Sequence, residues 1–442
     1  MADIRSVPGL RYSAAADLSA LVTPPYDVIS PEAQARYYER HSDNIIRLEL
    51  GRDEPDDNEL NDRYTRAATT FAEWRLQGVL RQDRPSLYVY EQDFSVGGKR
   101  FTRVSLLARV RLEPWDARVV LPHERTLSKP IEDRLKVLRA CVANLSPIMA
   151  LYDDPDRQVA RRLDAARDAT PEISFTDESG EDHRLWLITD DGFAAEIIAY
   201  FRERQLYIAD GHHRYETALT YRDEVRASHP SLPADDPTGF VLMALSAIED
   251  PGLVVLPTHR IVRGVAQDRL AHLGDALQQW FEREPLHDGD TAHAWVERLA
   301  RAGGTEQHAT ALVIVARDGA ALWRLSGRGQ ATMREIVVAG EGERHSDAWA
   351  ALDVAVLHEL VLERALGITS EDVRAGQRIT YTRDAEDAAN AALVGGADLA
   401  VLLNPTPPEA IRDVALAGDR MPQKSTYFYP KLITGLVINP LW

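Results

Sequence analysis

One segment of this sequence changes from a strand pattern to a helix pattern within two residues. The apolar run Leu206-Tyr207-Ile208-Ala209 leads into Asp210-Gly211, and a helical pattern begins at His212. A strand, a tight turn and a helix in succession are a basic unit of proteins that mix helices with sheets. Apolar strands and helical stretches also alternate over residues 267–403. We therefore predict a mixed α/β (α+β) fold with a second α/β lobe on the C-terminal side.

The domain boundary is predicted from a Pro-rich segment of the sequence. A Pro-rich break at residues 229–237 separates residues 1–235 from residues 236–442. Within the first part, residues 86–94 and 99–112 have strand patterns and flank Val96-Gly97-Gly98, which is typical of a β-hairpin turn. The tail, residues 421–442, is too apolar and aromatic for a free terminus, so we expect it to pack back on the body.

Charge and cysteine content exclude several classes of protein. The 442 residues include 51 basic and 69 acidic side chains, a formal charge of −18, so a long polyanion would be repelled. Cys141 is the only cysteine, which excludes an intrachain disulfide and a Cys-rich zinc cluster. No signal pattern and no apolar run of about 18 residues is present. We expect a soluble cytoplasmic protein with no nucleic-acid or membrane partner.

The densest polar cluster is Asp210-Gly211-His212-His213-Arg214-Tyr215-Glu216, at the start of the predicted helix. A helix N-terminus attracts anions, Gly211 permits their close approach, and Arg214 offers a forked counter-charge for phosphate. His212 and His213 are candidates for proton transfer or for hydrogen bonds to phosphate. Asp210 is a candidate ligand for Mg²⁺. The alternative is a capped helix start whose charged side chains face water.

A second cluster begins with Pro122-His123-Glu124-Arg125 and follows a strand-like run. Glu124 at the end of a strand is a candidate general base that takes a proton from a hydroxyl group. Arg125 or Lys129 is a candidate for holding an anion. A solvated charged loop explains the same residues equally well. The 86 positions between Glu124 and Asp210 (210 − 124) mean that only the fold brings them together.

The tail contributes a third candidate. Lys424 and Lys431 lie among hydroxyl and aromatic side chains, which suits one wall of a nucleotide or phosphate pocket. A docked tail with lysines that reach solvent explains the composition equally well. The sequence lacks the GxxxxGK[ST], GxGxxG, HExxH, GxSxG and CxxC motifs, which disfavours the common nucleotide and hydrolase folds.

Several long strings resemble a bacterial and archaeal family, the domain of unknown function 1015 (DUF1015). They are TPPYDVIS (23–30), LPHERTLSKPIEDRL (121–135), NLSPIMALYDD (144–154), YIADGHHRYETAL (207–219), LPTHRIV (256–262), LLNPTPPEAIRDVALAGDRMPQKSTYFYPK (402–431) and GLVINP (435–440). The resemblance extends over nearly the whole chain.

The DGHHRY string is also similar to the phosphate-binding turn of the ParB/sulfiredoxin superfamily, and DGHHR is similar to free serine kinases. This resemblance implies a ParB/sulfiredoxin-like core with insertions in residues 1–235. It implies Glu124 as the base, Asp210 as the partner of magnesium or of the substrate hydroxyl, and Gly211 to Arg214 as the phosphate cradle. His212 stands where sulfiredoxin has its reactive cysteine, so sulfinic-acid reduction is not expected.

The leading hypothesis is a small-molecule kinase. It uses Mg²⁺ and transfers a phosphoryl group from ATP or ADP to a hydroxyl of a serine-like amino acid or a polyol. Two rivals stay open. One is a ParB-like regulator that binds ATP or CTP without an acceptor, and the other is a metal-dependent phosphohydrolase. The oligomeric state also stays open, with a homodimer as one option.

Overall fold

The structure is a computed structural model of the chain. It describes residues 1–13, 17–126, 128–287, 290–303, 310–339 and 345–442. The chain forms two compact units: unit 1 contains Met1–Val254 and Pro430–Trp442, and unit 2 contains Val255–Tyr429. None of the described helices combines the length and apolar composition that a membrane crossing requires.

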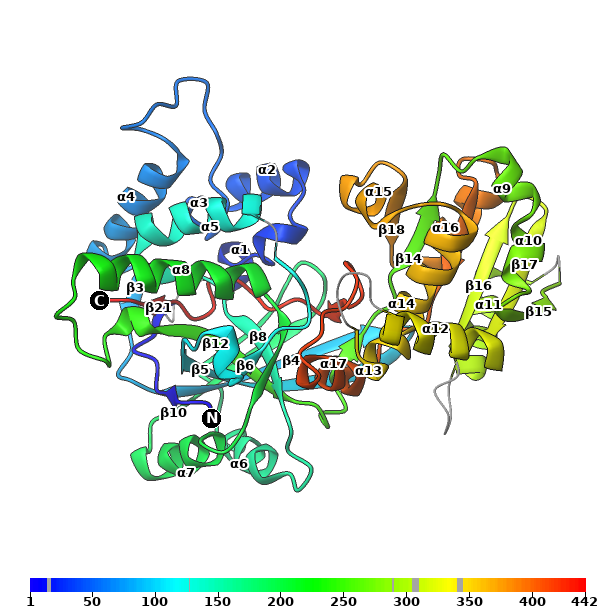
Figure 1. Cartoon of the computed structure of the whole chain (residues 1–442). Coiled ribbons are helices and arrows are strands. Elements are labelled where there is room, and N and C mark those ends of the chain that lie inside the picture. Colours follow the sequence, from blue (N-terminus) through cyan, green and yellow to red (C-terminus); the bar gives the residue numbers. More distant parts are fainter. Residues whose placement is uncertain (14–16, 127, 288–289, 304–309, 340–344) are drawn as a thin grey trace. The chain divides into compact units, whose positions relative to one another are not determined.

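A mixed sheet organises unit 1 (Figure 1). Its strands in the described part of the unit are β1 (Ile4–Arg5), β4 (Leu87–Val96), β5 (Lys99–Arg111), β6 (Val120–Leu121), β8 (Ile148–Tyr152), β9 (Ile173–Thr176), β10 (Asp182–Ile188), β11 (Leu206–Asp210) and β12 (Phe240–Ala247). The order along the sheet is β6-β11-β8-β12-β5-β4-β10-β9, and β1 pairs with β5. β6 is parallel to β11 and β12 is parallel to β8, whereas the other pairs are antiparallel.

Some helices of unit 1 cover the sheet and others pack on one another. They are α1 (Leu18–Leu21), α2 (Pro31–Arg40), α3 (Ile46–Glu49), α4 (Arg63–Leu76), α5 (Ser128–Cys141), α6 (Gln158–Ala166), α7 (Asp191–Phe201) and α8 (His212–Ser228). Short 3₁₀ turns cover Tyr26–Val28, Trp115–Ala117 and Pro237–Gly239, and short strands are β2 (Leu10–Tyr12), β3 (Leu80–Gln82), β7 (Ala143–Asn144) and β21 (Asn439–Pro440). In the view of Figure 1, α6 and α7 lie below the sheet and α8 lies above it, with α5 packed beside α8.

The core of unit 1 follows from the period-2 pattern of its strands. Alternate residues of β4 and β5, among them Leu87, Val89, Leu106 and Ala108, are fully buried and form one apolar cluster with residues of α6, α7 and α8. The β4–β5 hairpin turns through Gly97 and Gly98, both with positive φ. Such backbone angles suit the right-handed twist of paired strands.

Unit 2 contains an antiparallel sheet with helices packed on it. Its strands, in the order β15-β17-β16-β19-β14-β18, are β14 (His259–Val262), β15 (Phe281–Pro285), β16 (Ala311–Ala316), β17 (Gly319–Leu325), β18 (Ile379–Thr382) and β19 (Leu399–Leu402). Its helices are α9 (Gln267–Ala271), α10 (Leu273–Leu277), α11 (Ala292–Gly303), α12 (Gly327–Ala339), α13 (Asp347–Ala350), α14 (Asp353–Val356), a π-helical segment (Leu357–Ala365), α15 (Ser370–Ala375), α16 (Ala385–Leu393) and α17 (Pro408–Leu416). Two further short strands are β13 (Val254–Val255) and β20 (Phe428–Tyr429). The predicted mixed α/β class is confirmed, and the second group of strands and helices does lie on the C-terminal side.

The structure divides the chain later than the Pro-rich break suggests. β12 belongs to unit 1 because it pairs with β5 on one side and β8 on the other. Residues 430–442 also belong to unit 1. There Ile438 exchanges two backbone hydrogen bonds with Leu10, and the Asn439 amide donates to Asn144 Oδ1 at 2.8 Å.

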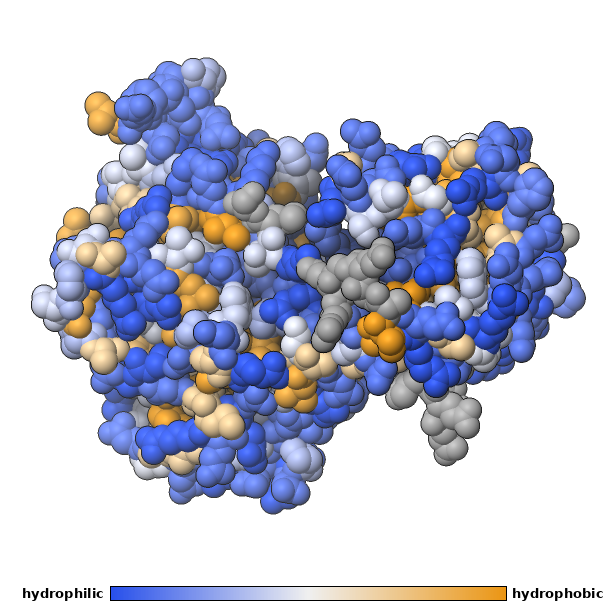
Figure 2. Space-filling view, viewed as in Figure 1, coloured by the Kyte–Doolittle hydropathy of each residue, from blue (hydrophilic) through white to orange (hydrophobic). Residues whose placement is uncertain are grey.

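The surface is mainly hydrophilic. Figure 2 shows charged and polar side chains over most of the visible face, with apolar side chains in scattered groups. This distribution agrees with an excess of 18 acidic side chains over basic ones and gives no sign of a broad apolar face in this view.

Candidate functional site

Three chain segments meet at one edge of the sheet in unit 1. β6 and β11 are parallel neighbours, so the residues that follow them, Pro122-His123-Glu124 and Gly211-His212, leave the sheet at the same edge. β8 is antiparallel to β11, and its Met149 is in register with Asp210. The segment that leads into β8, Ser146-Pro147, therefore lies at this edge as well. Residues far apart in the sequence are brought together by strand order alone.

Asp210, the last residue of β11, is held between two cations. Arg214 Nη2 donates to Asp210 Oδ2 at 2.8 Å, and Lys431 Nζ donates to Asp210 Oδ1. The three side chains are 11–17% exposed. Burial alone would raise the pKa of Asp210, but the charges of Lys431 and Arg214 lower it far below the ordinary value. Asp210 is therefore ionised throughout the neutral range, and the three groups together carry a net positive charge.

The Arg214 side chain also donates hydrogen bonds to groups other than Asp210. Its Nη1 atom donates to the carbonyl oxygen of Pro147 at 2.6 Å and to Ser146 Oγ at 3.1 Å. Arg214 lies in the first turn of α8, which begins after Gly211. Gly211 has a φ of +95° and provides no side-chain cap. The guanidinium group and the positive end of the helix dipole therefore lie at the same edge of the sheet, an arrangement that suits an anion.

Gly211 is required by two local features. Its φ is positive, and a Cβ atom at this position would lie 2.8 Å from Arg214 Nη2. We predict that Gly211→Ala lowers the free energy of unfolding by about 1–3 kcal/mol because a non-glycine residue is strained at such a φ. Chemical denaturation measures this loss. Gly274→Ala is the matched control, since a Cβ at Gly274 meets open space and φ there is not in the left-handed range. Equal stability of the two variants would contradict the prediction.

The position of Lys431 depends on two buried polar side chains that the sequence did not identify. Arg103 Nη2 donates to the carbonyl oxygen of Pro430 at 2.6 Å, and Gln92 Nε2 donates to the carbonyl oxygen of Lys431 at 3.2 Å. Arg103 is fully buried, and burial lowers its pKa. The two donors lie on β5 and β4, so the sheet itself anchors the tail. An arginine within a strand pattern gave no signal that would reveal this role.

His123 and His212 connect the two predicted motifs directly. The backbone N–H of His123 donates to His212 Nε2 at 3.2 Å, and the ring centroids lie 4.6 Å apart. His123 Nδ1 donates to the carbonyl oxygen of Ile208 at 2.7 Å. Because His212 Nε2 accepts a hydrogen bond, the ring proton of neutral His212 is on Nδ1. Both histidines are buried and join the end of β6 to the start of α8.

The other predicted site residues are distributed as follows. Glu124 is half-buried and follows His123 directly, so its backbone lies beside His212; Arg125 is exposed. His213 is half-buried in the first turn of α8. Lys424 belongs to unit 2, is exposed, and accepts a hydrogen bond from Arg260 through its carbonyl oxygen at 3.1 Å. The structure therefore brings Lys431 to Asp210, and Lys424 stays a prediction.

The metal role of Asp210 stays a prediction. Both of its oxygen atoms contact cationic groups, so Mg²⁺ would compete there with Lys431 and Arg214. Mg²⁺ in such sites is usually held by one or two carboxylates together with substrate phosphates and water.

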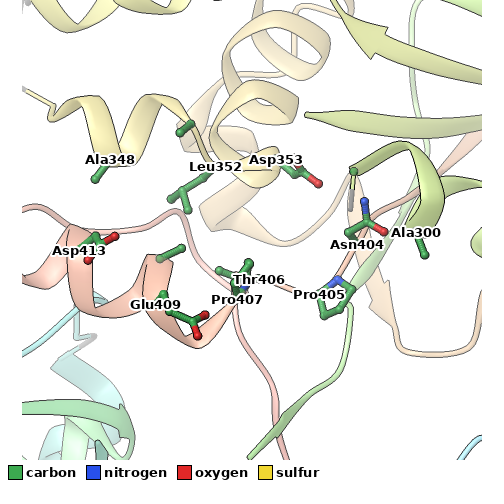
Figure 3. Close-up of a pocket in the computed structure, with 13 residues that line it drawn as sticks. Ala300, Ala348, Leu352, Asp353, Asn404, Pro405, Thr406, Pro407, Glu409 and Asp413 are labelled. Atoms are coloured by element: carbon green, nitrogen blue, oxygen red, sulfur yellow. The ribbon is translucent and has the colours of Figure 1, made fainter. Parts of the chain in front are cut away.

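Unit 2 contains a separate cavity of about 470 Å³ (Figure 3). Its wall is largely small and apolar, and Asp353 and Asn404 lie near each other on one side while Asp413 lies on the other. Burial raises the pKa of Asp353 to about 7, although Thr310 and Asn404 oppose the shift. The described wall has acidic groups and no basic side chain, so it does not suit a phosphate.

Comparison with known proteins identifies the family. A family model described as "Protein of unknown function (DUF1015)" matches residues 4–355. The chain belongs to the DUF1015 family. The matched region contains both motifs of the candidate site, whereas Lys431 lies beyond it. No curated protein matches this DUF1015 sequence.

Several solved structures show a distant likeness to this DUF1015 protein. A free serine kinase in complex with AMP is 12% identical and covers 73% of this chain and 86% of its own, with a TM-score of 0.31. SbnI with a C-terminal truncation, from Staphylococcus aureus, is 13% identical and covers 76% and 87%, with a TM-score of 0.34. A conserved hypothetical protein from Pyrococcus furiosus is 11% identical and covers 74% and 92%, with a TM-score of 0.31.

Proposed function

We propose that this protein is a small-molecule kinase that transfers a phosphoryl group from ATP or ADP to a hydroxyl of a serine-like amino acid or a polyol. The observation that carries the proposal is the Asp210–Arg214–Lys431 cluster at the start of α8, with the Pro122-His123-Glu124 segment beside it. The net positive charge of the cluster and the helix N-terminus both favour a phosphate group.

The residues have distinct roles in this proposal. Arg214, Lys431 and the first turn of α8 bind the nucleotide phosphates and offset the charge that develops on the transferred group. Asp210 orients both cations, because it contacts each of them. His212, with its proton on Nδ1, and His213 complete the phosphate cradle together with Gly211.

Glu124 acts as the general base in the proposed reaction. It takes the proton of the acceptor hydroxyl while the oxygen attacks the terminal phosphorus atom, and the bond to the leaving nucleotide breaks. The products are a phosphate monoester and ADP or AMP. Arg125, directly after Glu124 and exposed, is the proposed contact for an anionic group of the substrate.

The test is a search for a phosphorylated product. Purified protein is incubated with Mg²⁺, ATP or ADP, and a mixed metabolite pool, and mass spectrometry detects any compound that gains one phosphoryl group. We expect such a product only when protein, nucleotide and a hydroxyl acceptor are all present. Nucleotide binding without product would instead indicate a ParB-like regulator, and release of phosphate without acceptor would indicate a phosphohydrolase. Either result would overturn the kinase assignment.

A further inference from the structure

The β9–β10 hairpin carries a second polar cluster, separate in composition from the Asp210 site. Its loop is fixed by Asp177, whose Oδ1 atom accepts the backbone N–H groups of Ser179 at 2.8 Å and Glu181 at 3.0 Å. The backbone N–H of Asp177 also donates to the carbonyl oxygen of Glu181 at 2.9 Å. One carboxylate oxygen of Asp177 therefore holds the turn, and the other oxygen, Oδ2, faces His183.

His183 is held rigidly with one edge of its ring toward the carboxylates. The residue is fully buried on β10, its Nδ1 lies 2.8 Å from the Tyr90 hydroxyl, and its ring stacks on Phe175 with centroids 4.9 Å apart. Nε2 lies 3.3 Å from Asp177 Oδ2 but forms no hydrogen bond. A buried nitrogen without a hydrogen bond is uncommon in folded proteins and requires an explanation.

The third member is Glu181, which is 7% exposed. One ligand atom each from Asp177, Glu181 and His183 lies within 4.8 Å of the other two, and in the described part of the chain no other three His, Cys, Asp or Glu side chains gather so closely. A cation between the two carboxylates and the imidazole edge would offset the cost of burying them together.

We propose that Asp177, Glu181 and His183 bind a divalent transition-metal ion of the Zn²⁺ or Mn²⁺ type. An imidazole nitrogen together with carboxylate oxygens suits these ions better than Mg²⁺ or Ca²⁺, which prefer oxygen ligands alone. Three protein ligands leave at least one coordination position for water or a further ligand. Tyr90, at the opposite nitrogen of the ring, fixes the orientation of His183, as the outer partners of metal-binding histidines generally do.

This inference is independent of the proposed kinase activity. The bound ion closes the β9–β10 loop onto the buried edge of His183 and stabilises the hairpin. The rival explanation is a direct contact between His183 and Asp177 with no ion bound. The two explanations predict different responses to added metal.

The experiment uses the full chain after treatment with a chelator. ZnCl₂ and MnCl₂ are titrated separately into wild-type protein, and calorimetry and thermal unfolding follow the binding. Asp177→Asn keeps the Oδ1 acceptor of the turn and replaces Oδ2 by an amide group. We expect it to weaken binding of both metals by about 10-fold or more and to abolish the metal-dependent rise in Tm. His183→Gln is the second variant and should have the same effect.

Glu178→Gln is the matched control on the same loop. Glu178 accepts a hydrogen bond from the Tyr37 hydroxyl and pairs with Arg40 at 3.1 Å, outside the cluster. The Glu178→Gln protein should bind both metals as the wild type does. Wild-type protein that binds neither metal would overturn the proposal in favour of a direct His183–Asp177 contact. Unchanged binding in both Asp177→Asn and His183→Gln, or an equal loss in Glu178→Gln, would also overturn it.

Discussion

Glu124→Gln slows phosphoryl transfer by about 100-fold or more and leaves nucleotide affinity nearly unchanged, if Glu124 is the base. The amide has the size of the carboxylate but cannot accept the proton of the acceptor hydroxyl. The nucleotide, in contrast, is held by Arg214, Lys431 and the start of α8, which the substitution does not touch. Steady-state kinetics with the acceptor found by mass spectrometry measures the first effect, and calorimetric titration of nucleotide measures the second.

A neighbouring glutamate provides the control for this experiment. Glu132 lies on α5, is 73% exposed and pairs with Lys136 at 3.1 Å. Glu132→Gln removes the same charge from the same part of the sequence and should leave both turnover and affinity unchanged. Unchanged turnover in Glu124→Gln would remove Glu124 from the mechanism, whereas a parallel loss of nucleotide affinity would show a binding role instead.

Lys431→Met has the largest expected effect on stability, a loss of about 3 kcal/mol. Asp210 is largely buried, and without Lys431 its negative charge is offset by Arg214 alone. Urea unfolding measures the loss. The double variant Asp210→Asn/Lys431→Met removes the charge as well and should recover part of the stability. No recovery would show that Lys431 stabilises the fold by packing and not through its charge.

The loss of stability in Lys431→Met should depend on pH and become smaller in acid. The pKa of Asp210 in the folded protein is lowered from 3.8, so its ion pairs contribute stability above that value and lose it as the pH falls below it. The stability difference between wild type and Lys431→Met should therefore be fully present at pH 7 and shrink in acid. Lys136→Met, on an exposed pair, should leave stability nearly unchanged at each of these pH values.

The local elements at the site could be predicted from the sequence. The apolar run 206–209 followed by Asp210-Gly211 indicated a strand, a turn and a helix, and the structure has β11 and α8 there. The Val96-Gly97-Gly98 turn was also confirmed, between β4 and β5. These features depend on patterns within about ten residues, where side-chain period and glycine conformation decide the structure.

The hydrogen bonds that hold the backbone around Lys431 could not be predicted from the sequence, because they depend on the order of the strands in the sheet. Arg103 and Gln92 lie more than 300 positions before the carbonyl groups that they bind. The sequence pattern also did not predict β14, β15, β17 and β18 of unit 2. β17 begins at Gly319 and contains small residues, and β14 begins with the polar residues His259 and Arg260. His259 is buried, and burial lowers its pKa to about 4.

For the same reason, the cluster of Asp177, Glu181 and His183 could not be predicted from the sequence. The strand-like residues 173–189, interrupted by Glu178-Ser179-Gly180-Glu181, predict a hairpin, and the structure has β9 and β10 there. Nothing in that pattern shows that Tyr90 of β4 meets His183 or that Glu181 is buried. The partner of a strand, and the depth to which a side chain is buried, are set by the whole fold.

The position of Lys431 in the last segment of the chain has a consequence for the synthesis of the protein. Unit 1 is discontinuous: its first 254 residues are made before unit 2, and its last segment, which carries Lys431, is made after it. During translation Asp210 can pair with Arg214 early, but its second cation, Lys431, is still about 220 codons away. A chain that ends within unit 2 therefore contains the strands of the first sheet but lacks Lys431, so the Asp210–Arg214–Lys431 cluster is the last part of unit 1 to form.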